Sequence, residues 1–116
     1  MTTPRPSGLP TLPSYESAYA LTEKILGIDG VAELRGGRFG EVALLYPRCK
    51  ITGLRLDDIQ QGQQTLEVNV AAYYGYNLTE LAQSITAAVA DSDLCDVNSI
   101  DVVISDVVKL TQLKEL

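Results

Sequence analysis

The segment from Leu66 to Val108 constrains the fold most strongly, because its pattern is strand, helix, strand. Residues 66–72 alternate apolar and polar side chains, which is typical of a strand with one buried face. The buried face is predicted to hold Leu66, Val68, Val70 and Ala72. Asn77 is a plausible helix cap, and residues 78–89 repeat apolar side chains at helical spacing. Residues 101–108 are apolar enough to form a last strand. This strand–helix–strand unit predicts a crossover connection, which would be right-handed if its two strands are parallel.

The residues before this unit predict one more helix and three short strands. Ser14 is a plausible N-cap, and apolar side chains at helical spacing follow it until Gly27 or Gly30 ends the helix. Strands are predicted at residues 31–34, 41–46 and 51–56, with a polar turn at 58–63. We therefore expect an α+β two-layer sandwich, in which two helices cover one face of a mixed sheet of about four to five strands.

The length of 116 residues fits a single domain, and 46% hydrophobic residues are enough for one core. Residues 1–13 hold four of the five prolines and no periodic pattern, so they predict a flexible N-terminal arm. The single domain is expected at residues 14–108, and residues 109–116 form a C-terminal tail.

Charge is unevenly distributed along this chain of net charge -6. One acid, Glu41, stands among five basic residues: Arg35, Arg38, Arg48, Lys50 and Arg55. An acidic protein is an unlikely partner for nucleic acid in general, but a local basic patch suits an anion or an acidic protein. We take Arg38, Arg48, Lys50 and Arg55 as the candidate partner-binding residues, with a solvated charged face as the simpler alternative.

The composition offers no sign of catalysis. The chain has no histidine, and no acid–base or nucleophile–base pair is apparent from spacing. We expect neither enzymatic activity nor a cofactor or metal. In a reducing compartment, the two cysteines, Cys49 and Cys95, are expected to be free thiols. No apolar run reaches the ~18–20 residues that span a bilayer, and no signal peptide is recognisable, so we expect a cytoplasmic protein without direct membrane insertion.

Residues 36–42 contain three glycines, Gly36, Gly37 and Gly40. The spacing fits neither a Walker loop nor a dinucleotide fingerprint. Residues 37–40 read GRFG, a GxxG that KH domains use to grip a nucleic-acid backbone, although their loop joins two helices. The alternative is a structural turn with positive φ and Phe39 folded back onto the core.

A second open choice concerns the tyrosines at the end of the alternating strand, Tyr73, Tyr74 and Tyr76. Aromatic rings in a row can stack nucleobases. Tyrosines at a strand-to-helix corner more often pack their rings and leave the hydroxyl groups in water. The acidic residues in this part of the sequence favour packing of the rings over the stacking of nucleobases.

Taken in order, several segments resemble the alkaline shock protein family, the bacterial envelope stress response proteins. The similar segments are GGRFGEVA (36–43), YPRCK (46–50), GLRL (53–56), LEVNVAA (66–72), YG (74–75), the helix at 78–89 and IDVVISDV (100–107). The likeness extends from Tyr15 to Val108. Two features depart from the family pattern: Cys49 in the basic turn, and the polar turn DIQQGQ at 58–63.

The resemblance implies a small non-enzymatic adaptor or scaffold of the envelope (alkaline) stress response. It would act by protein–protein interaction with a membrane-anchored partner, peripheral at the inner face of the membrane. Self-association into a homo-oligomer is a further expectation, because the sheet can carry an open edge that accepts another strand.

Overall fold

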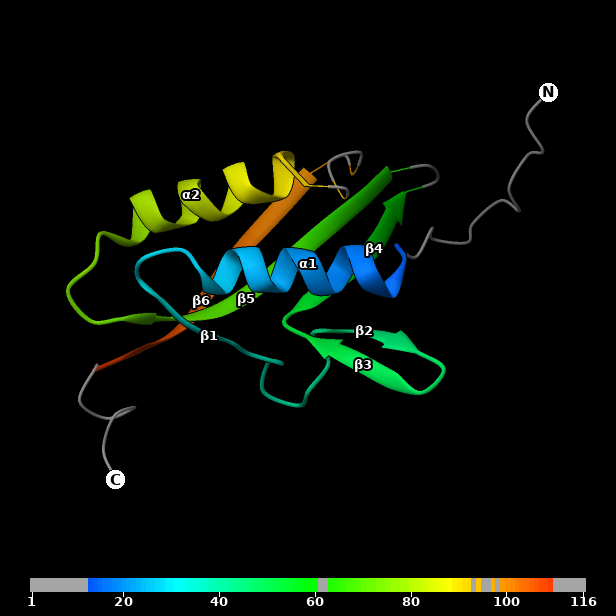
Figure 1. Cartoon of the computed structure of the whole chain (residues 1–116), viewed down its shortest axis with the longest axis horizontal. Helices are drawn as coiled ribbons and strands as arrows, with labels where there is room; N and C mark the ends of the chain where they lie inside the picture. Colours follow the sequence, from blue (N-terminus) through cyan, green and yellow to red (C-terminus); the bar gives the residue numbers. More distant parts are fainter. Residues whose placement is uncertain (1–12, 61–62, 93, 95–96, 98, 110–116) are drawn as a thin grey trace.

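A computed structural model describes residues 13–60, 63–92, 94, 97 and 99–109 (Figure 1). The elements are α1 (Tyr15–Leu26), β1 (Val31–Leu34), β2 (Ala43–Tyr46), β3 (Cys49–Thr52), β4 (Leu54–Gln60), β5 (Gln63–Tyr73), α2 (Leu78–Ala90) and β6 (Ser99–Val108). The predictions for the arm before residue 13, for the tail after residue 109 and for Cys95 lie outside the described residues. No helix within the described residues is long and apolar enough to cross a membrane.

Strand β5 is the centre of a four-stranded sheet. β6 runs parallel to it from the Thr65–Ser99 pair to the Tyr73–Val108 pair, and so takes the whole of one edge. The other edge is shared by two antiparallel strands in succession: β4 pairs with the first half of β5, and β1 with its last residues. The predicted crossover is therefore confirmed, and its strands are parallel.

Both helices lie on the same face of this sheet, as the sequence predicts (Figure 1). The cap of α1 is the Ser14 side chain, which accepts a hydrogen bond from the backbone N–H of Ser17 at 3.1 Å. The cap of α2 is Asn77, whose Oδ1 accepts from the N–H of Glu80 at 3.0 Å. Each helix buries one stripe at helical spacing against the predicted strand face; the buried apolar members are Ala18, Leu21 and Ile25 in α1, and Leu81, Ile85, Ala88 and Val89 in α2. These contacts form the α+β sandwich.

The stretch predicted as one strand from Ile51 to Leu56 is divided in the structure. β3 ends at Thr52, Gly53 has φ +98°, and β4 begins at Leu54 in the other sheet. The N–H of Gly53 donates to the Val42 carbonyl and the Gly53 carbonyl accepts from the N–H of Asn69, so this one residue connects both sheets. Of the polar turn predicted at 58–63, residues 58–60 lie in β4 and Gln63 begins β5, and residues 61–62 lie outside the described residues.

β2 and β3 form a separate two-stranded hairpin, which the sequence did not distinguish from the main sheet. Leu44 and Ile51 are cross-strand partners and are both buried in the core cluster. Tyr46 fixes the hairpin to the start of α1: its hydroxyl donates to the Pro13 carbonyl at 2.9 Å, and its ring meets Tyr15 edge-on at 5.6 Å. One face of the hairpin is thus buried and the other is turned outward.

Arg35 crosses the face of the main sheet that the helices leave open. Its guanidinium contacts Glu33 at 2.6 Å and Asp106 at 3.2 Å. These two acids are the cross-strand partners of Ala71 on either side. A group that touches both must lie over Ala71, which explains why this residue is fully buried on an otherwise open face.

Candidate functional site

The outward face of the β2–β3 hairpin and the loop before it carry three of the four predicted partner-binding residues. Arg48 lies in the two-residue turn with Pro47, and Lys50 follows in β3. Arg38 lies in the glycine loop that leads into β2. All three side chains are exposed. We call this region, residues 38–50, the basic hairpin.

Two features separate the basic hairpin from the rest of the surface. Lys24, Arg35 and Arg55 each form an ion pair, with Asp91, with Glu33 and Asp106, and with Asp57. Across the described residues, no ion pair is formed by Arg38, Arg48 or Lys50. The basic hairpin contains one carboxylate, Glu41, against its three cations. Positive charge in this region is therefore available to a partner.

Arg55, the fourth predicted residue, differs from these three because it forms an ion pair. It lies in β4 opposite Glu67, and its Nε contacts Asp57 Oδ1 at 3.0 Å. The hydrogen bond that Arg55 donates to Asp57, then the charges of Asp57, Glu67 and Glu41, raise the pKa of Arg55. Its charge is thus largely compensated within the chain.

Two large apolar side chains belong to the basic hairpin and were missed by the sequence analysis. Phe39 is 85% exposed and Leu45 is 70% exposed. The prediction that Phe39 folds back onto the core is therefore wrong. Leu45 is the cross-strand partner of Lys50, so an apolar and a cationic side chain stand side by side on the outward face. Exposed apolar and basic side chains therefore occur together on the basic hairpin.

The glycine loop is a turn between two strands, β1 and β2, and lacks the flanking helices of a KH loop. Gly37 and Gly40 have φ of +82° and +76°, as expected for a structural turn, whereas Gly36 has no positive φ. Glu41 folds back so that its Oε1 accepts the N–H of Phe39 at 2.9 Å. An anion arriving at this loop would meet a carboxylate already bound to its backbone.

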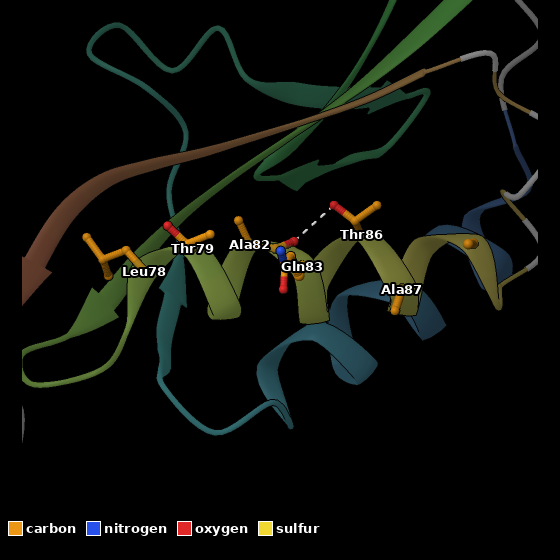
Figure 2. Close-up of a pocket in the computed structure, with 7 residues that line it drawn as sticks. Leu78, Thr79, Ala82, Gln83, Thr86 and Ala87 are labelled. Carbon is orange, nitrogen blue, oxygen red and sulfur yellow. Dashed lines mark hydrogen bonds between the residues drawn. The ribbon is translucent and has the colours of Figure 1, made fainter.

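A shallow, open depression lies along the outer flank of α2 (Figure 2). The lining residues all come from this one helix, from Leu78 to Ala90, and none of them carries a charge or a nucleophile other than the threonine hydroxyls. One of those hydroxyls, on Thr86, donates to the Ala82 carbonyl at 2.9 Å. The flank is an uncharged helical surface and holds no group suited to acid–base chemistry.

The last two features to consider in the described part of the chain are metal ligands and thiols. Within it, no three His, Cys, Asp or Glu side chains gather to hold a metal ion. Cys49 is an exposed free thiol.

No family model matches the chain, and no match was found among curated proteins or solved structures.

Proposed function

We propose that this protein is a non-enzymatic adaptor of the bacterial cell-envelope (alkaline) stress response, and that it binds an acidic segment of a membrane-anchored partner through the basic hairpin. The family proposed is that of the alkaline shock proteins, on the sequence resemblance alone. The proposed site of action is the inner face of the cell membrane, which the protein reaches through its partner.

The observation that carries this proposal is the set of unpaired cations. Arg38, Arg48 and Lys50 have no ion-pair partner within the described residues, and they share one region with exposed Phe39 and Leu45. In a chain of net charge -6, such a region attracts an acidic partner and orients it toward one part of the surface. The apolar side chains then supply contact area that excludes water.

The test is recovery of the tagged, full-length chain from its native cells, with nuclease present and absent. The wild-type protein should bring one integral membrane protein with it from the membrane fraction. Lys50→Glu should lower that recovery about tenfold or more, because like charges facing each other across an interface cost several kcal/mol. Lys24→Glu is the matched control: the same substitution at an exposed cation on α1, which should leave recovery unchanged.

Three results would contradict the proposal. Equal losses from Lys50→Glu and Lys24→Glu would mean that only net charge matters. Recovery from membranes stripped of protein, on anionic lipid alone, would mean that the hairpin binds headgroups instead of a protein. Recovery that nuclease abolishes would mean that the protein binds nucleic acid instead of a membrane protein.

A further inference from the structure

A second hollow lies at the C-terminal end of α1, where this end faces the segment between β5 and α2. Its volume is about 410 Å³. Its walls include the loop from Leu26 to Ala32 and three tyrosines, Tyr73, Tyr74 and Tyr76. Among the described residues, no lysine or arginine lines it; Lys109, one residue past the end of β6, is not part of its walls.

Among the described residues that line this hollow, the one charged side chain is negative. Asp29 contributes an exposed carboxylate. α1 ends at Leu26 with Gly27 as its cap, so the negative end of the helix dipole points at the same place. Both features favour a cation and disfavour a phosphate, which argues against a nucleotide stacked on the tyrosines.

Two of the three tyrosines that line the hollow are exposed. Tyr74 is 73% exposed and Tyr76 is 48% exposed. Tyr15 packs on the rings of both Tyr19 and Tyr46, but the three corner tyrosines make no ring–ring contact with one another in the described structure. Ring faces that are not covered by other rings attract cations through their quadrupole.

The backbone holds this corner in a fixed arrangement. The N–H of Tyr73 donates to the Gly30 carbonyl at 2.8 Å, and the N–H of Tyr74 donates to the Val108 carbonyl at 2.7 Å. The Tyr76 ring packs directly on Gly30, where a Cβ would lie 2.9 Å from ring atom Cδ2. The aromatic wall and the Asp29 loop are therefore joined before any ligand binds.

From this geometry we propose that the hollow is a binding site for one organic cation, the arginine or lysine side chain of a basic protein segment. Its volume of about 410 Å³ is large enough to admit one such side chain. Asp29 pairs with the charge while the tyrosines enclose the apolar stem and the cationic head. The chain would then bind a basic segment here and an acidic one at the basic hairpin.

The test is a titration of the full-length, isotope-labelled chain by NMR with acetyl-Gly-Arg-Gly-amide. The control peptide carries citrulline, which keeps the shape of arginine and removes its charge. The arginine peptide should shift the amide signals of residues 27–31 and 73–76, and the citrulline peptide should not. Equal shifts with both peptides, or shifts confined to other residues, would overturn the proposal.

Variants provide a second criterion. Asp29→Asn and Tyr74→Leu should each weaken arginine-peptide binding about two- to fivefold, as expected for exposed ion pairs and cation–π contacts. Tyr19→Leu is the matched control, because it removes a tyrosine that is 50% exposed on α1 and does not line the hollow. Unchanged affinity in both site variants, with their remaining spectrum intact, would likewise overturn it.

Discussion

Glu41 shows how one side chain determines the character of the glycine loop. Its carboxylate accepts hydrogen bonds from its own backbone N–H and from that of Phe39, and these bonds lower its pKa below the ordinary value of 4.5. The charges of Arg55 and Arg38 lower the pKa further. A Cβ at Gly37 would lie 2.7 Å from Glu41 Oε2, so the glycine leaves room for this arrangement. The loop thus carries its own anion.

This arrangement predicts a pH dependence of stability. Because the pKa of Glu41 is lower in the folded than in the unfolded state, its contribution is fully present above the unfolded value near 4.5 and is lost as pH falls through the folded value. A carbon-13 NMR titration should show the Glu41 carboxyl titrating below that value. In urea unfolding, the difference between wild type and Glu41→Gln should shrink as pH falls from neutral to about pH 3. A constant difference would contradict the account.

A pair of leucines separates packing from surface exposure. Leu54 is fully buried between the sheet and the helices, whereas Leu45 is 70% exposed on the basic hairpin. Leu54→Ala should lower the free energy of unfolding by about 2–5 kcal/mol through lost burial and a residual cavity. Leu45→Ala should change it by no more than about 0.5 kcal/mol. Urea denaturation of both variants checks this, and similar losses would show that Leu45 is part of the core.

Residue type alone does not predict which of these side chains are buried and which form ion pairs. Leu44 and Leu45 are neighbours of the same type, and the pairing of Leu44 with Ile51 decides which of them is buried. The five basic residues from 35 to 55 likewise look equivalent in the sequence. Arg55 pairs with Asp57, and Arg35 pairs with Glu33, each two residues away in the sequence, so these two pairs were within reach of a local pattern. The second acid that Arg35 contacts, Asp106, is brought near by strand pairing and leaves no clear signal in the sequence.

At the level of elements, Gly53 separates the hairpin from the main sheet. A Cβ at this position would lie 2.6 Å from the Cβ of Leu34, and the backbone φ of +98° is one that side chains rarely adopt. The two hydrogen bonds of Gly53 to Val42 and Asn69 keep the strands on either side in register. The direction in which the basic hairpin leaves the sheet therefore depends on this glycine.

Two glycine variants test this role. Gly53→Ala should destabilise the protein by about 1–3 kcal/mol from backbone strain, and by more from the contact with Leu34. Gly75→Ala is the control, since Gly75 has a similar φ of +102° but no atom within 4 Å of the place that a Cβ would take, and it should show the strain alone. Thermal unfolding compares the two, and an equal loss in both would mean that the close approach to Leu34 is unimportant.

The elements that the sequence predicted well are those whose signals are local. The alternation in β5, the Asn77 cap and the apolar stripe of α2 each occur within a dozen residues, and all three are confirmed. The break at Gly53 was missed because apolar residues continue on both sides of it. A single glycine inside a strand pattern can mark either a bulge or a close approach, and the sequence does not distinguish them.

The whole molecule separates charge between its two candidate surfaces. The basic hairpin, near the start of α1, carries Arg38, Arg48 and Lys50, which form no ion pair within the described residues. The hollow lined by Tyr73, Tyr74 and Tyr76, at the other end of α1, carries Asp29. This separation is consistent with an adaptor that contacts two partners of opposite charge. It also predicts that binding at the basic hairpin weakens as salt rises, because exposed charges are screened beyond about 8 Å at physiological ionic strength.

The most direct measurement of the central claim is photocrosslinking in native cells from position 45. A benzophenone amino acid replaces Leu45 on the basic hairpin, and in a second strain it replaces Thr86 on the outer flank of α2, which is also exposed. The account predicts that irradiation joins position 45 to an integral membrane protein, and that position 86 gives no such product. A membrane-protein product from position 86 alone, or none from position 45, would contradict the claim that the basic hairpin is the docking surface.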